Sequence, residues 1–227
     1  MEFLTKSMTL ALSVLIPNID EDEVLDVIVD VISRYEEPWR HYHSLPHVVA
    51  ILRALEENVG SEAFEKMGEL EVARLILMCV YHDIIYVPGA KVNELLSAQY
   101  LQCFAIDNEI PLEQVMPIIR AIKASANHFV RAAELSATEH LFLDADLSIL
   151  AHPVWETYAT YVGDVCSEYE AVGVSSEVFF EGRKAFLRSA LEGGTGGRFF
   201  HSKEFDHMNV LAMANITHEL REYEDEG

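Results

Sequence analysis

Apolar residues recur every three or four positions along most of the chain, the spacing that gathers side chains on one face of an α-helix. The clearest such segment follows Asp20, whose carboxylate can cap a helix that opens with an acidic turn. Its apolar positions are Val24, Leu25, Ile28, Val29, Ile32 and Tyr35. The pattern predicts a helix that ends before Pro38.

The same periodicity predicts helices over about 8–16, 47–55, 70–85, 94–105, 111–127, 140–150, 154–171, 176–191 and 203–223. Asn93 is a candidate cap for one of them, and Ser136 with Glu139 has the spacing of a capping box for another. The segment 70–85 is apolar on nearly every side, which is typical of a central, buried helix. Strand patterns are scarce and no long linker or repeat divides the chain, so we expect one all-α domain spanning residues 1–227.

Composition and charge narrow the function classes. The 227 residues are 50% hydrophobic, enough for a substantial core, which excludes disorder as the main state. A net charge of −22 opposes binding to a nucleic-acid duplex. Cys79, Cys103 and Cys166 are few and far apart, which argues against disulfides or a thiolate zinc site and indicates a reducing, cytoplasmic compartment. The apolar stretch 8–16 is too short to cross a bilayer, so we expect no membrane partner.

Ionisable residues stand at three places on the predicted helices where apolar ones are expected. His47 heads the apolar face of its helix. His82 and Asp83 end the apolar segment 70–85, and Asp146 has apolar neighbours. Taken alone, each has an ordinary explanation, such as a hydrogen-bonded core histidine or a carboxylate paired with an arginine. Together, two imidazoles and two carboxylates can surround one divalent ion, a shell that suits Mn, Fe, Co, Ni, Zn or Mg.

The order of these residues also resembles a known family. His47, then His82-Asp83, then Asp146 is similar to the H…HD…D pattern of the HD-domain superfamily. The chain resembles more closely a bacterial subgroup of predicted metal-dependent HD phosphohydrolases, from about residue 35 to the end. The segments that carry this resemblance are Arg40-His-Tyr-His-Ser-Leu-Pro-His47, Tyr81-His-Asp-Ile-Ile-Tyr86, Asn93-Glu94 with Ser97, Asp144-Ala-Asp-Leu147, Glu168-Tyr169, Gly182-Arg183 and Ala214-Asn215-Ile216 with Glu219-Leu220. A bare HD dipeptide carries little information, whereas the full ordered set is specific.

The resemblance implies an HD-type all-α fold with a metal core over about 35–150 and C-terminal helices, 151–227, packed on it. It implies one metal ion, or two in some branches, and His47, His82, Asp83 and Asp146 as ligands. It also implies hydrolysis of a phosphoester by a metal-activated water. The chain departs from the family pattern at 165–167, Val-Cys-Ser, where an Arg is expected, which puts in question one contact away from the metal.

Two ligand assignments have a nearby competitor. Asp144 lies about 200° around an ideal helix from Asp146, so only one of them can face the ion. We choose Asp146 because its surroundings resemble the superfamily pattern more closely, and assign Asp144 to a supporting or capping role. His43 competes with His47, but it precedes Pro46, whereas His47 heads the apolar helix face.

Three further residues are candidates for catalysis. Arg40 could grip a phosphate with its planar guanidinium, or equally pair with the acidic helix before it. Glu94 could orient or deprotonate the metal-bound water, or equally complement a helix dipole. His128 could serve as acid, phosphate donor or ligand of a second metal ion, or be a surface histidine.

The expected function is therefore that of an enzyme that hydrolyses a small phosphorylated substrate with a divalent metal ion. Two alternatives stay open: a non-catalytic regulatory module that binds a metal or ligand, and a two-iron HD oxygenase, for which His43 and His128 could supply extra ligands. A helical interaction protein without a site ranks last, because it leaves the ionisable residues on buried helices unexplained. The sequence leaves open whether the chain forms a homo-oligomer.

Overall fold

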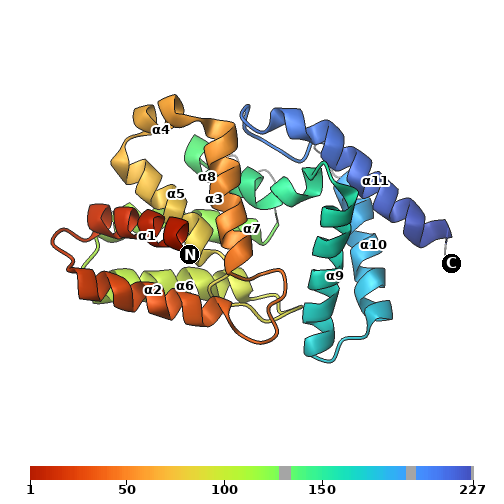
Figure 1. Ribbon diagram of the computed structural model, residues 1–227, viewed down its shortest axis with the longest axis horizontal. Helices are drawn as coiled ribbons and strands as arrows, with labels where there is room; N and C mark the ends of the chain where they lie inside the picture. Colours follow the sequence, from red (N-terminus) through yellow and green to blue (C-terminus); the bar gives the residue numbers. More distant parts are fainter. Residues whose placement is uncertain (128–133, 193–197, 226–227) are drawn as a thin grey trace.

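The computed structural model describes residues 1–127, 134–192 and 198–225 of the chain (Figure 1). Every regular element in these ranges is a helix, so the expectation of an all-α fold is confirmed. None of these helices combines the length and apolarity that crossing a membrane requires. The elements are α1 (Glu2–Leu15), α2 (Glu21–Tyr35), α3 (Leu45–Val59), α4 (Ser61–Met67), α5 (Glu69–Tyr81), α6 (Asn93–Asp107), α7 (Leu112–Ser125), α8 (Ala137–Asp146), the 3-10 helix η1 (Leu147–Ala151), α9 (Trp155–Ala171), α10 (Ser176–Glu192), the 3-10 helix η2 (Asp206–Met208) and α11 (Asn209–Asp225).

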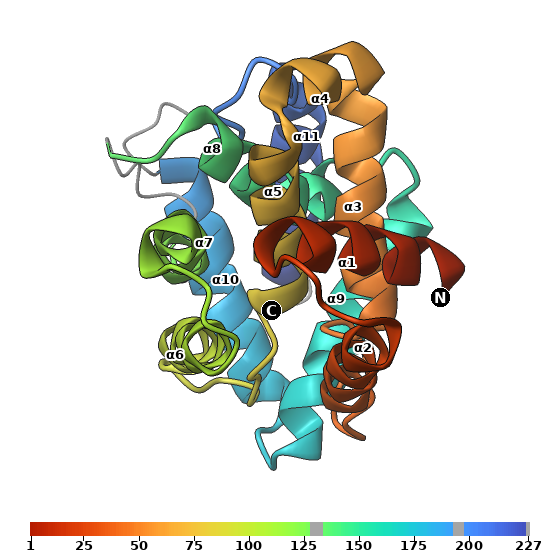
Figure 2. The same ribbon diagram turned by 90° about the vertical axis from the view of Figure 1, so that its left-hand side faces the viewer.

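Helix α5 is the centre of the fold. All seven residues from Leu75 to Tyr81 are buried, as its nearly continuous apolar sequence predicts. It packs against α1, α3, α7 and α8, and Figure 2 shows it in the middle of the molecule between α3 and α7. The end of α5 therefore lies inside the molecule, and the residues that follow it, His82 and Asp83, are buried.

The C-terminal helices form a layer beside this centre. Figure 1 shows α9 and α10 side by side with α11 crossing them, and α11 also packs on η1. Asn215 of α11 donates hydrogen bonds from Nδ2 to the carbonyls of Leu150 and His152, both at 3.0 Å. These bonds join the last helix to the segment that directly follows α8.

Side-chain caps stabilise the first turns of α2 and α8. The Asp20 carboxylate accepts a hydrogen bond from the Glu23 backbone N–H at the start of α2, and the Glu23 side chain returns one to Asp20. Ser136 and Glu139 form the same capping box at the start of α8. Both caps are as predicted from the sequence.

Other details differ from the sequence-based expectations. Helix α4 was not expected, because it is only seven residues long and lies between two glycines with positive φ. Asn93 does not cap α6: its side chain bonds the backbone N–H and carbonyl of Val87 and so holds the loop before α6. Leu25 and Val29 of α2 are 51% and 63% exposed, so the buried face is narrower than predicted.

Candidate metal centre

Three helix ends bring the four predicted ligands together. His47 lies in the first turn of α3, where Pro46 presets the backbone for helix initiation. His82 and Asp83 directly follow the last residue of α5, and Asp146 is the last residue of α8. His82 is the C-cap of α5 and keeps helical backbone angles, and Asp83 follows it at the end of the helix.

These four residues, the His/Asp cluster, approach one another closely. The Asp146 Oδ1 atom lies 3.1 Å from His47 Nε2 and 3.6 Å from His82 Nε2. The Asp83 Oδ2 atom lies 3.0 Å from His82 Nε2. One ligand atom from each of His47, His82 and Asp83 falls within 4.8 Å of the others. The structure thus places two imidazoles and two carboxylates around one point, with three of the four residues buried.

The hydrogen bonding of His82 shows that this point requires a positive charge. Its Nδ1 lies 3.0 Å from the Cys79 carbonyl, which can only accept, so Nδ1 carries a proton. In the neutral ring Nε2 then presents a lone pair toward the Asp83 and Asp146 carboxylates, and it makes no well-aligned hydrogen bond among the described residues. A second proton or a cation must therefore lie between Nε2 and these carboxylates, and the donor set fits a divalent metal ion.

Two opposing effects set the pKa shifts in the cluster, namely burial and the charges of neighbouring cluster residues. Burial lowers the pKa of His82, but the Asp83 and Asp146 carboxylates outweigh it and raise this pKa to about 9. Burial also acts to raise the pKa of Asp83, and the adjacent His82 overcomes it and holds this pKa well below its usual value. For His47 burial dominates and lowers the pKa despite its contact with Asp146, so His47 offers a neutral imidazole nitrogen.

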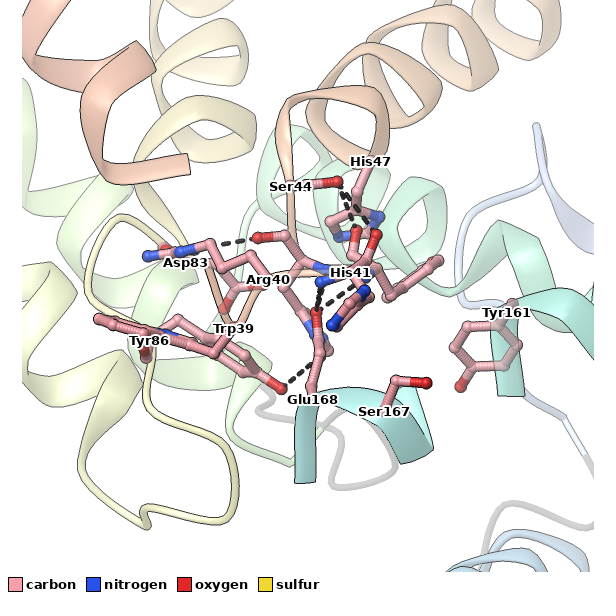
Figure 3. Close-up of polar contacts among 12 residues, drawn as sticks. Trp39, Arg40, His41, Ser44, His47, Asp83, Tyr86, Tyr161, Ser167 and Glu168 are labelled. Atoms are coloured by element: carbon pink, nitrogen blue, oxygen red, sulfur yellow. Dashed lines mark hydrogen bonds and ion pairs between the residues drawn. The ribbon is translucent and has the colours of Figure 1, made fainter. Parts of the chain in front are cut away.

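His43 lies beside the cluster and has a buried carboxylate partner. Its Nδ1 lies 2.6 Å from the Glu168 carboxylate, its ring stacks on Tyr86, and the Tyr86 hydroxyl also donates to Glu168. Glu168 additionally accepts the backbone N–H groups of residues 41, 42 and 43; Figure 3 shows it directed from α9 toward this loop. Burial acts to lower the pKa of His43, but Glu168 and the nearby Asp83 raise it overall. Glu168 thus fixes both the loop and the imidazole.

Arg40 has a different environment from the one considered for a phosphate clamp. Its guanidinium donates to the carbonyls of His43 (3.1 Å), Asp83 (2.7 Å) and Ile84 (3.2 Å), and to the Glu37 carboxylate (2.9 Å). Its side chain is 0% exposed. These bonds engage the guanidinium and join the His43 loop to the turn after α5, so Arg40 supports the backbone around the cluster.

The other candidate residues lie in three different settings. Glu94, in the first turn of α6, is half-buried and lines a cavity with the His/Asp cluster. His128 lies outside the described residues. Asp144 accepts hydrogen bonds from the backbone N–H groups of His201 and Ser202 and from the Ser202 hydroxyl. Asp144 therefore anchors the segment before η2, while Asp146 faces the cluster.

Two hollows meet at the His/Asp cluster. The inner cavity, of about 250 Å³, is lined by the cluster and by residues that include His43, Glu94, Tyr161 and Arg183. The outer groove, of about 700 Å³, runs along α3 and past η1. The residues that line both hollows are Tyr42, His47, Asp146 and Ile149. Both hollows are thus bordered by the His/Asp cluster.

Sequence reasoning assigned no individual role to Glu168 or Arg183, which appeared only within the family resemblance. The sequence pattern could have indicated that Glu168 is buried. It continues the helix face of Tyr158, Tyr161 and Val165 at three- and four-residue intervals. A carboxylate in such a stripe must find partners when buried. Its partners lie about 125 residues away in sequence, so their identity could not be read from the pattern.

Comparison of the chain with family models, with curated proteins and with solved structures finds no match. The functional interpretation therefore depends on the geometry of the cluster and of the two hollows.

Proposed function

We propose that the protein is a metal-dependent phosphohydrolase that cleaves a small organic phosphoester. The observation that carries this proposal is the buried Nε2 atom of His82, which faces two carboxylates while a second imidazole, that of His47, contacts one of them. Mixed nitrogen and oxygen donors of this kind hold divalent transition metals or Mg²⁺. A divalent ion held there would supply a Lewis acid and a bound water of lowered pKa.

In this proposal, two side chains that line the inner cavity carry the proton transfers. Glu94 lines the inner cavity outside the cluster, where its carboxylate can take a proton from the attacking water. His43 lines the same cavity with Nδ1 held by Glu168, so its Nε2 can deliver a proton to the leaving oxygen of the ester. In the balanced step, the water oxygen bonds to phosphorus, the ester P–O bond breaks and the alcohol leaves protonated.

The two hollows support an organic phosphate of moderate size as the substrate. The inner cavity has room for a phosphoryl group beside the cluster, and the outer groove is in the size range of small-molecule pockets. The groove is lined by apolar side chains together with polar ones such as Arg53, Asn58 and His152. We therefore assign the phosphoryl group to the inner cavity and the alcohol part to the groove.

The test begins with metal content. Protein stripped with a chelator should bind about one equivalent or more of Mn²⁺, Co²⁺, Ni²⁺ or Zn²⁺ by calorimetry, with a rise in melting temperature. His47→Ala should abolish this binding, whereas His207→Ala, at an exposed imidazole in η2, should retain it.

Metal-loaded protein is then screened for release of inorganic phosphate from nucleotides, sugar phosphates and cyclic nucleotides. Hydrolysis that chelation and His47→Ala both abolish supports the proposal. Absence of metal binding would overturn it, and metal binding without hydrolysis of any ester would favour a regulatory module instead.

A further inference from the structure

The inner cavity contains an arginine side chain, Arg183, that has no part in the reaction proposed above. Among the described residues that line it, Arg183 of α10 is the single guanidinium or ammonium group. The same cavity has carboxylates from Asp83, Asp146 and Glu94. A phosphate dianion would be repelled by these carboxylates unless cations compensate them. Arg40, which precedes the first cluster residue, is engaged with main-chain carbonyls.

Arg183 is held rigidly in this wall. Its Nε and Nη2 donate to the two oxygens of Glu219 at 2.8 and 3.0 Å, and its Nη1 donates to the Tyr161 hydroxyl at 2.9 Å. Glu219 is fixed in turn by the hydroxyls of Tyr158 and Tyr223. The Arg183 side chain is 7% exposed and that of Glu219 is 3% exposed. The guanidinium therefore loses little conformational entropy on meeting a ligand.

The protein does not engage every donor of this arrangement among the described residues. A guanidinium has five N–H groups, and a long contact from Nη2 to the Tyr158 hydroxyl at 3.4 Å brings the number engaged to four. One Nη1 hydrogen is left without a protein acceptor among the described residues. The Tyr161 hydroxyl accepts from Arg183, and its own hydrogen can be donated. Both residues line the inner cavity.

We propose that Arg183 and Tyr161 form the oxyanion subsite that binds the phosphoryl group of the substrate in the inner cavity. This inference rests on the proposed function, because it assigns the phosphoryl group to the hollow beside the cluster. A buried ion pair contributes little net stability compared with apolar residues of the same shape. The Arg183–Glu219 pair is better explained as a preorganised cation, which Glu219 orients in a buried position.

The test measures binding of inorganic phosphate to the full, Mn²⁺-loaded chain by calorimetry. The double variant Arg183→Met, Glu219→Gln removes the cation without leaving a buried carboxylate unpaired, and it should weaken phosphate binding by about tenfold or more at unchanged Mn²⁺ content. Glu219→Gln alone should tighten phosphate binding, because Arg183 loses its neutralising partner. Tyr161→Phe, which removes one hydroxyl and retains the ring, should weaken phosphate binding severalfold. Arg188→Met, at an exposed position of α10, is the matched control and should bind as the wild type does.

The outcomes separate this inference from the proposed function. A wild-type chain that binds no Mn²⁺ overturns both. A Mn²⁺-loaded wild type that binds no phosphate, or a double variant and Tyr161→Phe that both bind phosphate as the wild type does, overturns the subsite alone. Equal weakening by Glu219→Gln and by the double variant would show that the ion pair is structural and would also overturn it.

Discussion

Asp144 and Asp146, two residues apart on α8, direct their carboxylates to different parts of the molecule. The Asp146 Oδ1 atom lies 3.1 Å from His47 Nε2, whereas Asp144 is fully buried and bonds the backbone of residues 201 and 202. Two positions along a helix correspond to a rotation of about 200°, which accounts for the opposite directions. Within one turn, α8 thus carries a proposed metal ligand, Asp146, and a carboxylate that supports the fold, Asp144.

Alanine substitutions at these positions should therefore have opposite effects. Asp146→Ala should abolish Mn²⁺ binding and leave the stability of the metal-free protein within about 1 kcal/mol of wild type, because the lost contact with His47 is offset by relief of repulsion between Asp146 and Asp83. Asp144→Ala should retain the Mn²⁺ stoichiometry and lower the free energy of unfolding by about 2–4 kcal/mol, since several buried donors lose their acceptor. Calorimetric titration and urea unfolding test both. If Asp144→Ala is well folded but loses Mn²⁺ binding, the metal ligand is Asp144 and the assignment to Asp146 is wrong.

Much of the architecture could be predicted from the sequence because it depends on local rules. Helical periodicity located most of the helices, and the Asp20 and Ser136 caps were recognisable from residue type and spacing. The ionisable residues at the apolar ends of helices were also informative. A buried His82 or Asp83 needs a partner, and helices that pack around α5 bring such residues together.

The parts that could not be predicted depend on contacts distant in sequence. Nothing near Arg40 indicates that its guanidinium would meet the carbonyls of Asp83 and Ile84, more than 40 residues away. The pairing of His43 with Glu168 spans 125 residues. Both contacts are set by tertiary packing, so residue type and local spacing left their roles open.

The position of Arg40 predicts how it responds to substitution. Arg40→Lys retains the charge, but one ammonium group cannot reach three carbonyls and a carboxylate that lie in different directions. We expect a loss of about 2–3 kcal/mol in the free energy of unfolding and weaker Mn²⁺ binding, because the turn that carries Asp83 loosens. Arg34→Lys, at a partly exposed ion pair, is the control and should change stability by less than about 1 kcal/mol. Unchanged stability together with a raised KM would restore Arg40 as a substrate-binding residue.

The lowered pKa of Glu139 should make the stability of the metal-free protein depend on pH. Burial acts to raise its pKa, but the Arg120 guanidinium and the Ser136 N–H and hydroxyl lower it overall, below the usual value of 4.5. A lowered pKa in the folded state means that the stabilisation is present above about pH 4.5 and is lost as the pH falls through the folded value. Chelated wild type should exceed Glu139→Gln in stability by about 1–2 kcal/mol at pH 7. Urea unfolding from pH 7 to pH 3 should show this difference shrinking, while Glu113→Gln, an exposed first-turn Glu of α7, should show almost none. A difference that is constant with pH would mean that Glu139 acts through shape and not through its charge.

Glu94 tests the chemical step itself. It lines the inner cavity but is not part of the His/Asp cluster, so Glu94→Gln should leave Mn²⁺ affinity and stability nearly unchanged. Gln retains the size and hydrogen-bonding capacity of Glu but cannot take up the water proton, and loss of a general base lowers kcat by about 10²–10⁴. KM should change little, because the phosphoryl group is held elsewhere in the cavity.

Glu109→Gln, in the loop after α6, provides an exposed carboxylate as control and should retain wild-type kcat. Steady-state kinetics on an ester found in the screen, with Mn²⁺ content measured on the same samples, gives the answer. If Glu94→Gln turns over at the wild-type rate with metal bound, Glu94 only complements the start of α6. The metal ion alone would then have to lower the pKa of the attacking water enough for it to lose its proton.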